Sequence, residues 1–383
     1  MTVKSFALPL AVLLLGACSK SEAPQPQAPP QPPAERPGSG SPTAAKTPPK
    51  INAPAEGTPP VRRDGTMFGT SELMGTTVSL NVFVGPDGDG AKAGIAMQDA
   101  LAEMARIEGL MSEWKPKTEL SRLNQGAGGA AMLISKELFE VLELSKRIHA
   151  ETGGTFDVTF HGVGHLWSFK AGSTPPSPSQ IAAALPLVDG AAIELDADTR
   201  TARLPTAGMK IGLGAIAKGY AVDRASALLR ERGFANHVVE AGGDTYAAGS
   251  KGGDPWRVGV KDPETSGSLG VLSIRERAVV TSGDYMRFFE HEGRRYAHIL
   301  DPTTGWPIEQ GKSPKSVTLL AKDASQADAY CTAVTVMGAE AGLAFVESRP
   351  DLDAVIIERD GTVRFSSGLA GVYQALPPPK PEL

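Results

Sequence analysis

The segment with the clearest chemical potential runs from Gly212 to Gly233 and places a lysine just after two glycines. A strand-like start, a glycine loop and apolar residues at helical spacing predict a strand, a loop and a helix that ends at Gly233. Lys218 then lies in the first helical turn, where the helix dipole disfavours a cation unless an anion shares the site. Free N–H groups and an ammonium can converge there on a phosphate. A solvated lysine on a helix face fits the spacing equally well.

A second helix is predicted from Asp323 to Gly338, with Asp323 or Ser325 as its N-terminal cap. Asp328 and Thr332 are four residues apart, so they share one face of this helix. A carboxylate and a hydroxyl are hard oxygen ligands suited to Mg²⁺, which completes its shell with water and phosphate oxygens. The alternative is that Asp328 caps or pairs locally and that Thr332 belongs to the core. The spacing by itself favours this alternative.

The stretch Arg295–Pro307 predicts a strand that is interrupted by an Asp-Pro step and a Thr-Thr-Gly turn. His298 lies at the end of this strand, where its ring could contact a phosphate or act as an acid or base. A lone histidine on a strand is more often structural, so both roles stay open. The spacing of His291, Glu292 and His298 is not that of a zinc metalloprotease, and the sequence contains no Gly-x-Ser-x-Gly elbow.

Three large apolar residues, Met74, Trp114 and Phe156, could form a box for a flat ring, although a core position is the ordinary role of each. The segment Glu240–Asp244 places acids on both sides of a glycine pair. Such a pattern is typical of a turn. Neither feature identifies a ligand by itself.

The elements that must position these side chains show mixed strand and helix patterns from Met67 onward. Helices are predicted over Ile95–Met111 and Lys136–Ile148, because their apolar residues recur at helical spacing. The further predicted strands are Gly75–Val84, Lys210–Leu213, His237–Glu240, Trp256–Val260, Ala278–Thr281 and Ser316–Leu320. Because strands and helices do not alternate strictly and no internal repeat is evident, we expect a two-lobed α+β fold.

The composition excludes several classes of protein. The formal net charge is −5, the sequence pI is about 5.8 and no Lys/Arg cluster is present. Binding to nucleic acid is therefore not expected. The two cysteines, Cys18 and Cys331, are too few for a cysteine-rich zinc site, an iron–sulfur cluster or a disulfide framework.

The first 18 residues have the pattern of an export signal, with one lysine and then ten residues, mostly apolar, that are too few to span a bilayer. The run Leu15-Gly16-Ala17-Cys18 resembles the lipobox of bacterial lipoproteins, in which the cysteine receives the lipid. We therefore expect a lipoprotein that is anchored to the bilayer through Cys18 and faces the periplasm. Ser19 favours the outer over the inner membrane. A plain cleavable signal is the alternative.

The sequence divides into four parts. Residues 1–18 form the signal, and residues 19–65 form a Pro-rich tether with no apolar periodicity, which cannot bury enough surface to fold. Residues 66–376 form the functional domain, and residues 377–383 form a Pro-rich tail. The tether gives an anchored protein long reach, because extended Pro-rich chain covers about 3.1 Å per residue.

Taken together and in order, these segments resemble the FAD:protein FMN transferase (ApbE) family over about residues 66–350. The resemblance implies mixed or antiparallel sheets with packed helices around a T-fold-like core. It also implies an enzyme that takes FAD as substrate, uses Mg²⁺, transfers FMN to a threonine of a target protein and releases AMP. Acceptors of this family include subunits of membrane redox complexes.

The resemblance also implies roles for particular residues. Lys218 and His298 match catalytic positions, and His298 is the candidate for phosphate contact or acid–base assistance. The metal site matches the backbone carbonyl of Ala215 together with Asp328 and Thr332. The positions that match flavin-nucleotide contacts are Met74, Trp114, Thr155, Phe156, Asp157, Lys218 and Leu300.

This chain departs from the family pattern at two positions. Many members have Asp where this chain has Gly212, a position associated with FAD binding. Some have a second Asp as metal ligand where this chain has Cys331. The first departure could weaken nucleotide binding, and the second leaves Ala215, Asp328 and Thr332 to hold the metal.

Two other functions stay compatible with the same residues. One is a Mg²⁺-dependent FAD pyrophosphatase that releases FMN and AMP, since water and a threonine hydroxyl differ only as acceptors. The other is a non-catalytic flavin-binding lipoprotein, for which the Gly212 departure is the only support in the sequence.

Overall fold

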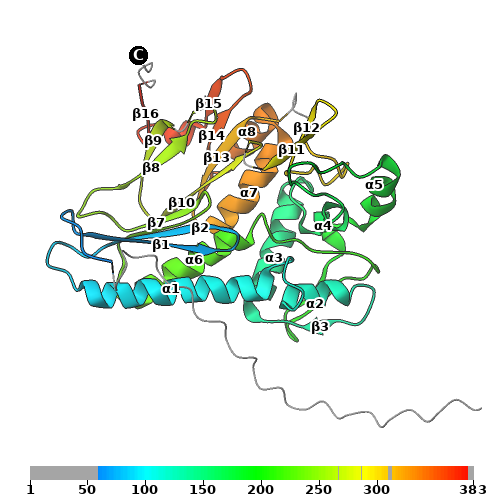
Figure 1. Cartoon of the computed structure of the whole chain (residues 1–383), viewed down its shortest axis with the longest axis horizontal. Helices are drawn as coiled ribbons and strands as arrows, with labels where there is room; N and C mark the ends of the chain where they lie inside the picture. The colour runs from blue at the N-terminus through cyan, green and yellow to red at the C-terminus, as the bar shows by residue number, and fades with distance from the viewer. Residues whose placement is uncertain (1–58, 266, 286, 309–312, 378–383) are drawn as a thin grey trace, which may run out of the picture. The chain divides into compact units, whose positions relative to one another are not determined.

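Eight antiparallel strands form the main sheet, in the order β1-β2-β6-β7-β10-β13-β14-β15 (Figure 1). This computed structural model describes residues 59–265, 267–285, 287–308 and 313–377. The export signal, Cys18, nearly all of the tether and most of the tail lie outside the described residues. The strands of the main sheet are β1 (Thr66–Leu73), β2 (Thr76–Phe83), β6 (His237–Ala241), β7 (Asp244–Ala248), β10 (Arg277–Gly283), β13 (Ser316–Ala321), β14 (Asp353–Ile357) and β15 (Val363–Phe365).

Three smaller antiparallel sheets accompany the main one: β16-β9-β8, β3-β5-β4 and the hairpin β11-β12. Their strands are β3 (Met132–Leu133), β4 (Glu194–Asp196), β5 (Thr201–Arg203), β8 (Trp256–Lys261), β9 (Ser268–Ile274), β11 (Phe288–His291), β12 (Arg294–Ala297) and β16 (Tyr373–Ala375). The helices are α1 (Gly90–Met111), α2 (Glu119–Gln125), α3 (Lys136–Glu151), α4 (His161–Gly164), α5 (Pro178–Ala184), α6 (Ala217–Glu231), α7 (Ala324–Met337) and α8 (Ala339–Glu347).

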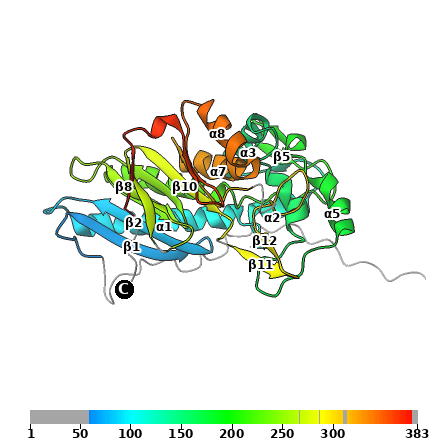
Figure 2. The same ribbon diagram turned by 90° about the horizontal axis from the view of Figure 1, so that it is seen from above.

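The central strands of the main sheet are buried on both faces. Successive side chains of a strand point to opposite faces. In β10, Ala278 and Val280 therefore join the core formed with helices α1, α6 and α7, whereas Val279 joins a separate core with Trp256 of β8 and Leu272 of β9. The main sheet is thus a middle layer between helices and the small sheet β16-β9-β8 (Figures 1 and 2).

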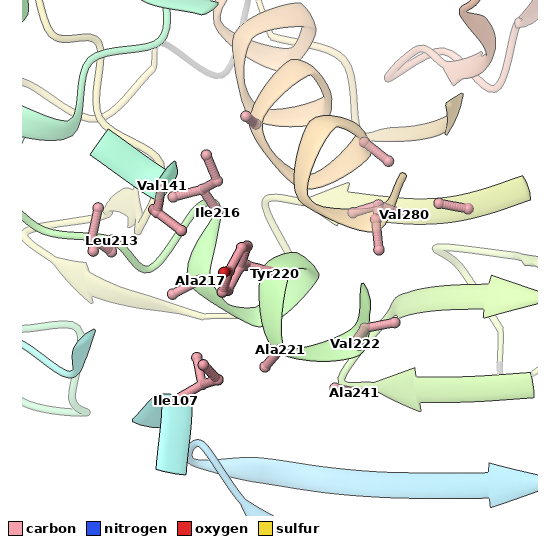
Figure 3. Packing of buried hydrophobic residues seen from close by; sticks show 14 of the residues in the cluster. Ile107, Val141, Leu213, Ile216, Ala217, Tyr220, Ala221, Val222, Ala241 and Val280 are labelled. Atoms are coloured by element: carbon pink, nitrogen blue, oxygen red, sulfur yellow. The ribbon is translucent and has the colours of Figure 1, made fainter. Parts of the chain in front are cut away.

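Helix α6 lies at the centre of the helical layer. Its buried residues Tyr220, Ala221 and Val222 pack among side chains from α1, α3 and the sheet (Figure 3). At Gly219 a Cβ would be 2.2 Å from the carbonyl oxygen of Ala324, so α7 approaches α6 more closely than any side chain there would permit. The absence of a Cβ at Gly219 therefore sets how near Lys218 lies to α7.

A separate hydrophobic cluster, rich in aromatic residues, lies apart from the main core. It gathers Trp167, Ile181 of α5, Phe289 of β11 and Tyr296 of β12, and Figure 2 shows the β11–β12 hairpin on this side of the sheet. Phe289 and Tyr296 stack with ring centroids 5.0 Å apart. None of the helices in the described residues has both the length and the apolar character that crossing a membrane requires.

Several sequence predictions are confirmed at the level of single elements. The predicted strands at β2, β6, β8, β10 and β13 are present, as are helices α3, α6 and α7. Gly233 ends α6 in a left-handed conformation, with φ +89°. Helix α1 begins at Gly90, five residues before the prediction, because Asp89 caps it by accepting from the Lys92 amide at 3.0 Å.

One local prediction is wrong and another is confirmed only in part. Lys210–Leu213 is not a strand, because its ladder partner is a side chain: Asn124 accepts from the Ile211 amide at 2.8 Å and donates to the Ile211 carbonyl at 2.9 Å. Asp323 is the N-cap residue of α7, as predicted, but its side chain makes no capping hydrogen bond. Asp223 of α6 supplies that contact instead, accepting from the amides of Ala324 at 2.7 Å and Ser325 at 2.9 Å.

Candidate active site

Three charged side chains from three elements meet at the start of α6. The Lys218 ammonium donates to Asp244 Oδ2 of β7 at 2.7 Å and to Asp328 Oδ2 of α7 at 3.2 Å. The amide of Gly219 also donates to Asp328 Oδ2, at 3.3 Å. We call Lys218, Asp244 and Asp328 the charge triad. Lys218 is therefore not a solvated lysine, and two carboxylates supply the anions that its place in the helix requires.

The electrostatics of the charge triad follow from its burial. Burial raises the pKa of Asp244 well above the ordinary carboxylate value; the charge of Asp328 adds to this rise and the Lys218 ammonium opposes it. Burial alone would lower the pKa of Lys218, but the two carboxylates outweigh it and raise that pKa. Lys218 is therefore a fixed cation at neutral pH, beside two carboxyl groups that one ammonium does not fully neutralise.

The residues predicted to hold a metal border the charge triad. Asp328 pairs with Lys218 rather than capping its own helix, and the Thr332 hydroxyl, half-buried, donates to the Asp328 carbonyl at 3.2 Å. Ala215 lies three residues before Lys218 in the loop that enters α6. These donors are a carboxylate, a hydroxyl and a carbonyl, all hard oxygens, so their chemistry fits Mg²⁺. Within the described residues, no cluster of three or more His, Cys, Asp or Glu side chains could hold a metal.

Asp244 is the member of the charge triad to which the sequence pattern assigned no chemical role. Its segment was interpreted only as a turn, and it is one: Gly242 and Gly243 have φ +62° and +103° between β6 and β7. The turn directs Asp244, 2% exposed, toward Lys218, which lies 26 residues earlier. The sequence does contain a signal for Asp244: an acidic residue directly after a glycine pair, at the start of a buried strand.

The loop Gly212–Ala215 links the charge triad to an aromatic surface. Gly214 accepts from Lys218 Nζ through its carbonyl at 3.4 Å, and a Cβ on Gly214 would be 3.5 Å from Glu113 Oε1. Burial raises the pKa of Glu113. The next residue, Trp114, is 78% exposed. This surface tryptophan is the site residue most available to an aromatic ligand.

The other residues predicted to contact flavin in the first half of the domain have structural roles. Met74 forms the turn between β1 and β2, with φ 53°, and packs partly against the core. Phe156 is 2% exposed and takes the core position that was the alternative to a ring-binding box. Asp157 accepts from the Gly190 amide at 2.9 Å, and the Thr155 hydroxyl donates to a backbone carbonyl at 3.0 Å.

His298 follows β12 and is held by one backbone carbonyl. Its amide lies 3.0 Å and its Nδ1 3.2 Å from the Arg287 carbonyl oxygen. The pKa of His298 is lowered to about 4, chiefly by burial, with the charges of Arg287 and Lys218 contributing. Since a carbonyl only accepts, Nδ1 carries the proton and Nε2 keeps its lone pair. Leu300 is buried in the separate cluster rich in aromatic residues.

Cys331 faces the sheet. Its thiol is within hydrogen-bond distance of the carbonyls of Val317, at 3.2 Å, and Val280, at 3.5 Å. Burial raises the pKa of the thiol to about 12. Cys331 is therefore a neutral thiol at physiological pH, and thiolate ligation of a metal is disfavoured.

Solved structures of ApbE proteins have a similar arrangement of sheets and helices. The ApbE protein of Thermotoga maritima superposes with a TM-score of 0.73 at 30% identity, covering 81% of this chain and 99% of that one. The flavin transferase ApbE from Vibrio cholerae gives a TM-score of 0.70 at 28% identity, covering 80% and 98%. The fold therefore places this chain in the flavin transferase class of proteins.

The sequence comparisons identify the family. The model of the ApbE family matches residues 74–356. The FAD:protein FMN transferase of Treponema pallidum is 33% identical over 303 residues, which cover 75% of this chain and 83% of that protein. A Klebsiella pneumoniae protein of the same name is 30% identical, with 77% and 90% covered. The chain belongs to the ApbE family.

Proposed function

We propose that this chain is an FAD:protein FMN transferase. The observation that carries the proposal is the charge triad, which places a permanent cation between two buried carboxyl groups beside a glycine loop in a member of the ApbE family. In the reaction, an acceptor threonine oxygen attacks the phosphorus of the FMN half of FAD. The P–O bond to the AMP phosphate breaks, AMP leaves with that oxygen, and the hydroxyl proton passes to a base.

The chain's own residues supply positive charge and a base. The Lys218 ammonium lies in the first turn of α6, where it would stabilise negative charge on a pyrophosphate. His298 Nε2 is the basic nitrogen of a neutral imidazole, so it can accept the proton of the acceptor hydroxyl. Positioning and charge neutralisation are what such phosphoryl-type transfer requires from a protein.

Mg²⁺ would be held by Asp328, Thr332 and the carbonyl of Ala215. When bound, it would neutralise charge on the phosphates of FAD. Asp328 already binds a cation, the Lys218 ammonium, at 3.2 Å. If Mg²⁺ bound to Asp328, Lys218 would stay paired with Asp244. The charge triad therefore offers one carboxyl group to each of the two cations.

The transfer reaction is tested with purified protein, FAD, Mg²⁺ and an acceptor that carries a candidate threonine. A covalently fluorescent acceptor together with AMP supports the proposal. AMP without a labelled acceptor would support the second candidate, an FAD pyrophosphatase, which the same charge triad favours because water can replace the hydroxyl. Flavin binding without AMP would indicate a non-catalytic carrier. An Asp328→Ala variant that transfers flavin unchanged in Mg²⁺ would remove the proposed metal site.

We also propose that the protein is a lipoprotein anchored through Cys18 and facing the periplasm, with the outer membrane favoured. The sequence Leu15-Gly16-Ala17-Cys18 supports this location, and the tether of residues 19–65 would let the enzyme reach a threonine on a membrane redox complex. Cys18→Ser should release the protein from membranes while FAD turnover is unchanged. A Cys18→Ser protein that stays in the membrane fraction would contradict the anchor.

A further inference from the structure

His161 fills the space beside Gly212 in which a side chain would otherwise lie. A Cβ built on Gly212 would be 3.0 Å from His161 Cβ and 3.1 Å from a ring carbon of Phe160. The loop cannot move away easily, because the Gly212 amide donates to the Val158 carbonyl at 2.8 Å. A side chain at position 212 would therefore crowd His161 and Phe160 and push them aside by a few tenths of an ångström, whereas glycine lets the imidazole lie in its present place.

The imidazole of His161 has unused hydrogen-bonding capacity. It is half-buried, and neither ring nitrogen has a hydrogen-bond partner in the part of the chain that the structure describes. Burial lowers the pKa of His161 to about 4, with the positive charges of His165 and Lys210 contributing. The ring is therefore neutral at physiological pH and offers one donor and one acceptor.

His161 also borders an exposed aromatic face. The ring of Trp114 lies edge-on to it, with centroids 6.0 Å apart and an interplanar angle of 80°. Trp114 follows Glu113, which borders Gly214, and Gly214 accepts from Lys218. The aromatic pair and the charge triad thus border the same four-residue loop, Gly212–Ala215.

We propose that Trp114 and His161 form the ring-binding wall of the FAD site: a flat ring of FAD stacks on Trp114 and hydrogen-bonds to a ring nitrogen of His161. This inference rests on the proposed function and adds a residue that determines how the substrate is held. The ligand must be an aromatic ring with polar edges, which the isoalloxazine and the adenine of FAD both provide. The Gly212 departure is thereby compensated within this chain, since the polar contact comes from position 161.

A mutant cycle tests the wall by FAD affinity, measured from the quenching of flavin fluorescence in EDTA without acceptor. His161→Ala should raise the Kd of FAD about tenfold, the effect of losing one buried hydrogen bond. His161→Gln, which keeps a donor and an acceptor, should recover part of this loss. Gly212→Ala should raise the Kd because its Cβ displaces His161, and its effect should be smaller in a His161→Ala background, where no imidazole remains to be displaced.

The matched control is His165→Ala. His165 is exposed and its Nδ1 lies 3.0 Å from the His161 carbonyl oxygen, so it shares the segment but not the contact with Gly212. Its Kd should equal that of the parent. The Kd values are compared directly where the variants have the same melting temperature. Otherwise each Kd is corrected for the fraction of protein that is folded in the assay. Titrations with FMN and with ADP identify the ring, because only the ligand that carries the bound ring should lose affinity in His161→Ala.

Two results would overturn the wall. One is an unchanged Kd in His161→Ala for FAD, FMN and ADP. The other is additive effects of Gly212→Ala and His161→Ala. Failure of the proposed function would look different: the parent protein itself would then bind no FAD, or would bind it without releasing AMP in Mg²⁺.

Discussion

Replacing Lys218 by methionine tests the charge triad directly. The substitution keeps most of the side-chain volume and removes the ammonium that Asp244 and Asp328 share at 2.7 and 3.2 Å. Both carboxyl groups are nearly inaccessible, with 2% and 4% of their residues exposed. Removing one partner of a buried ion pair costs about 3–5 kcal/mol, so we expect a loss of this size in the free energy of unfolding at pH 8.

The loss should depend on pH in a defined direction. Without the ammonium, which opposes the effect of burial, the pKa of Asp244 in the folded protein rises further above its unfolded value. The folded state then binds more protons than the unfolded state, so the variant gains stability as the pH falls. The difference between parent and Lys218→Met should therefore be smaller at pH 5 than at pH 8. Urea denaturation followed by circular dichroism at both pH values measures it.

Lys92→Met is the matched control. Lys92 also lies in the first turn of a helix and pairs with an aspartate, Asp89, at 3.2 Å, but both side chains are exposed. Exposed pairs contribute little, so the unfolding curve should hardly change. Mg²⁺ should stabilise Lys218→Met more than it stabilises the parent, because it replaces the missing cation. A loss below about 1 kcal/mol in Lys218→Met, or an equal loss at both pH values, would refute the argument.

Three further predictions concern helix packing and histidines. Gly219→Ala should lower the free energy of unfolding in urea by about 1–3 kcal/mol, because its Cβ meets the Ala324 carbonyl. Gly109→Ala, in the open part of α1, should raise it by about 0.5–1 kcal/mol. Burial lowers the pKa of His237 to about 4, so the unfolded state binds this proton at a higher pH than the folded state does, and the free energy of unfolding should fall as the pH drops from 6.5 to 4. His237→Gln should flatten this dependence. An equal slope in both proteins would contradict the prediction. His298 should stay neutral above about pH 5, so the acid limb of the transfer rate should have its midpoint near pH 4; a midpoint near 6.5 would argue against His298 as the base.

Much of the fold could be predicted from the sequence because local patterns determine local elements. The apolar spacing around Lys218 and Asp328 predicted α6 and α7, and the alternation in β2 predicted an amphipathic strand. The prediction failed where a side chain replaced a backbone partner. Asn124 pairs with Ile211 from 87 residues away, and Asp223 caps α7 from 101 and 102 residues away, so no local pattern records either contact.

The sequence by itself determined which side chains are available: a lysine after a glycine loop, and an aspartate and a threonine on one helical face. Tertiary structure decided which of them act together. Asp244 joins Lys218 across 26 residues and Asp328 joins it across 110, while His161 lies against Gly212. The physical reason is that hydrogen bonds within an element depend on spacing along the chain. Ion pairs and steric exclusion between elements depend on how closely those elements pack.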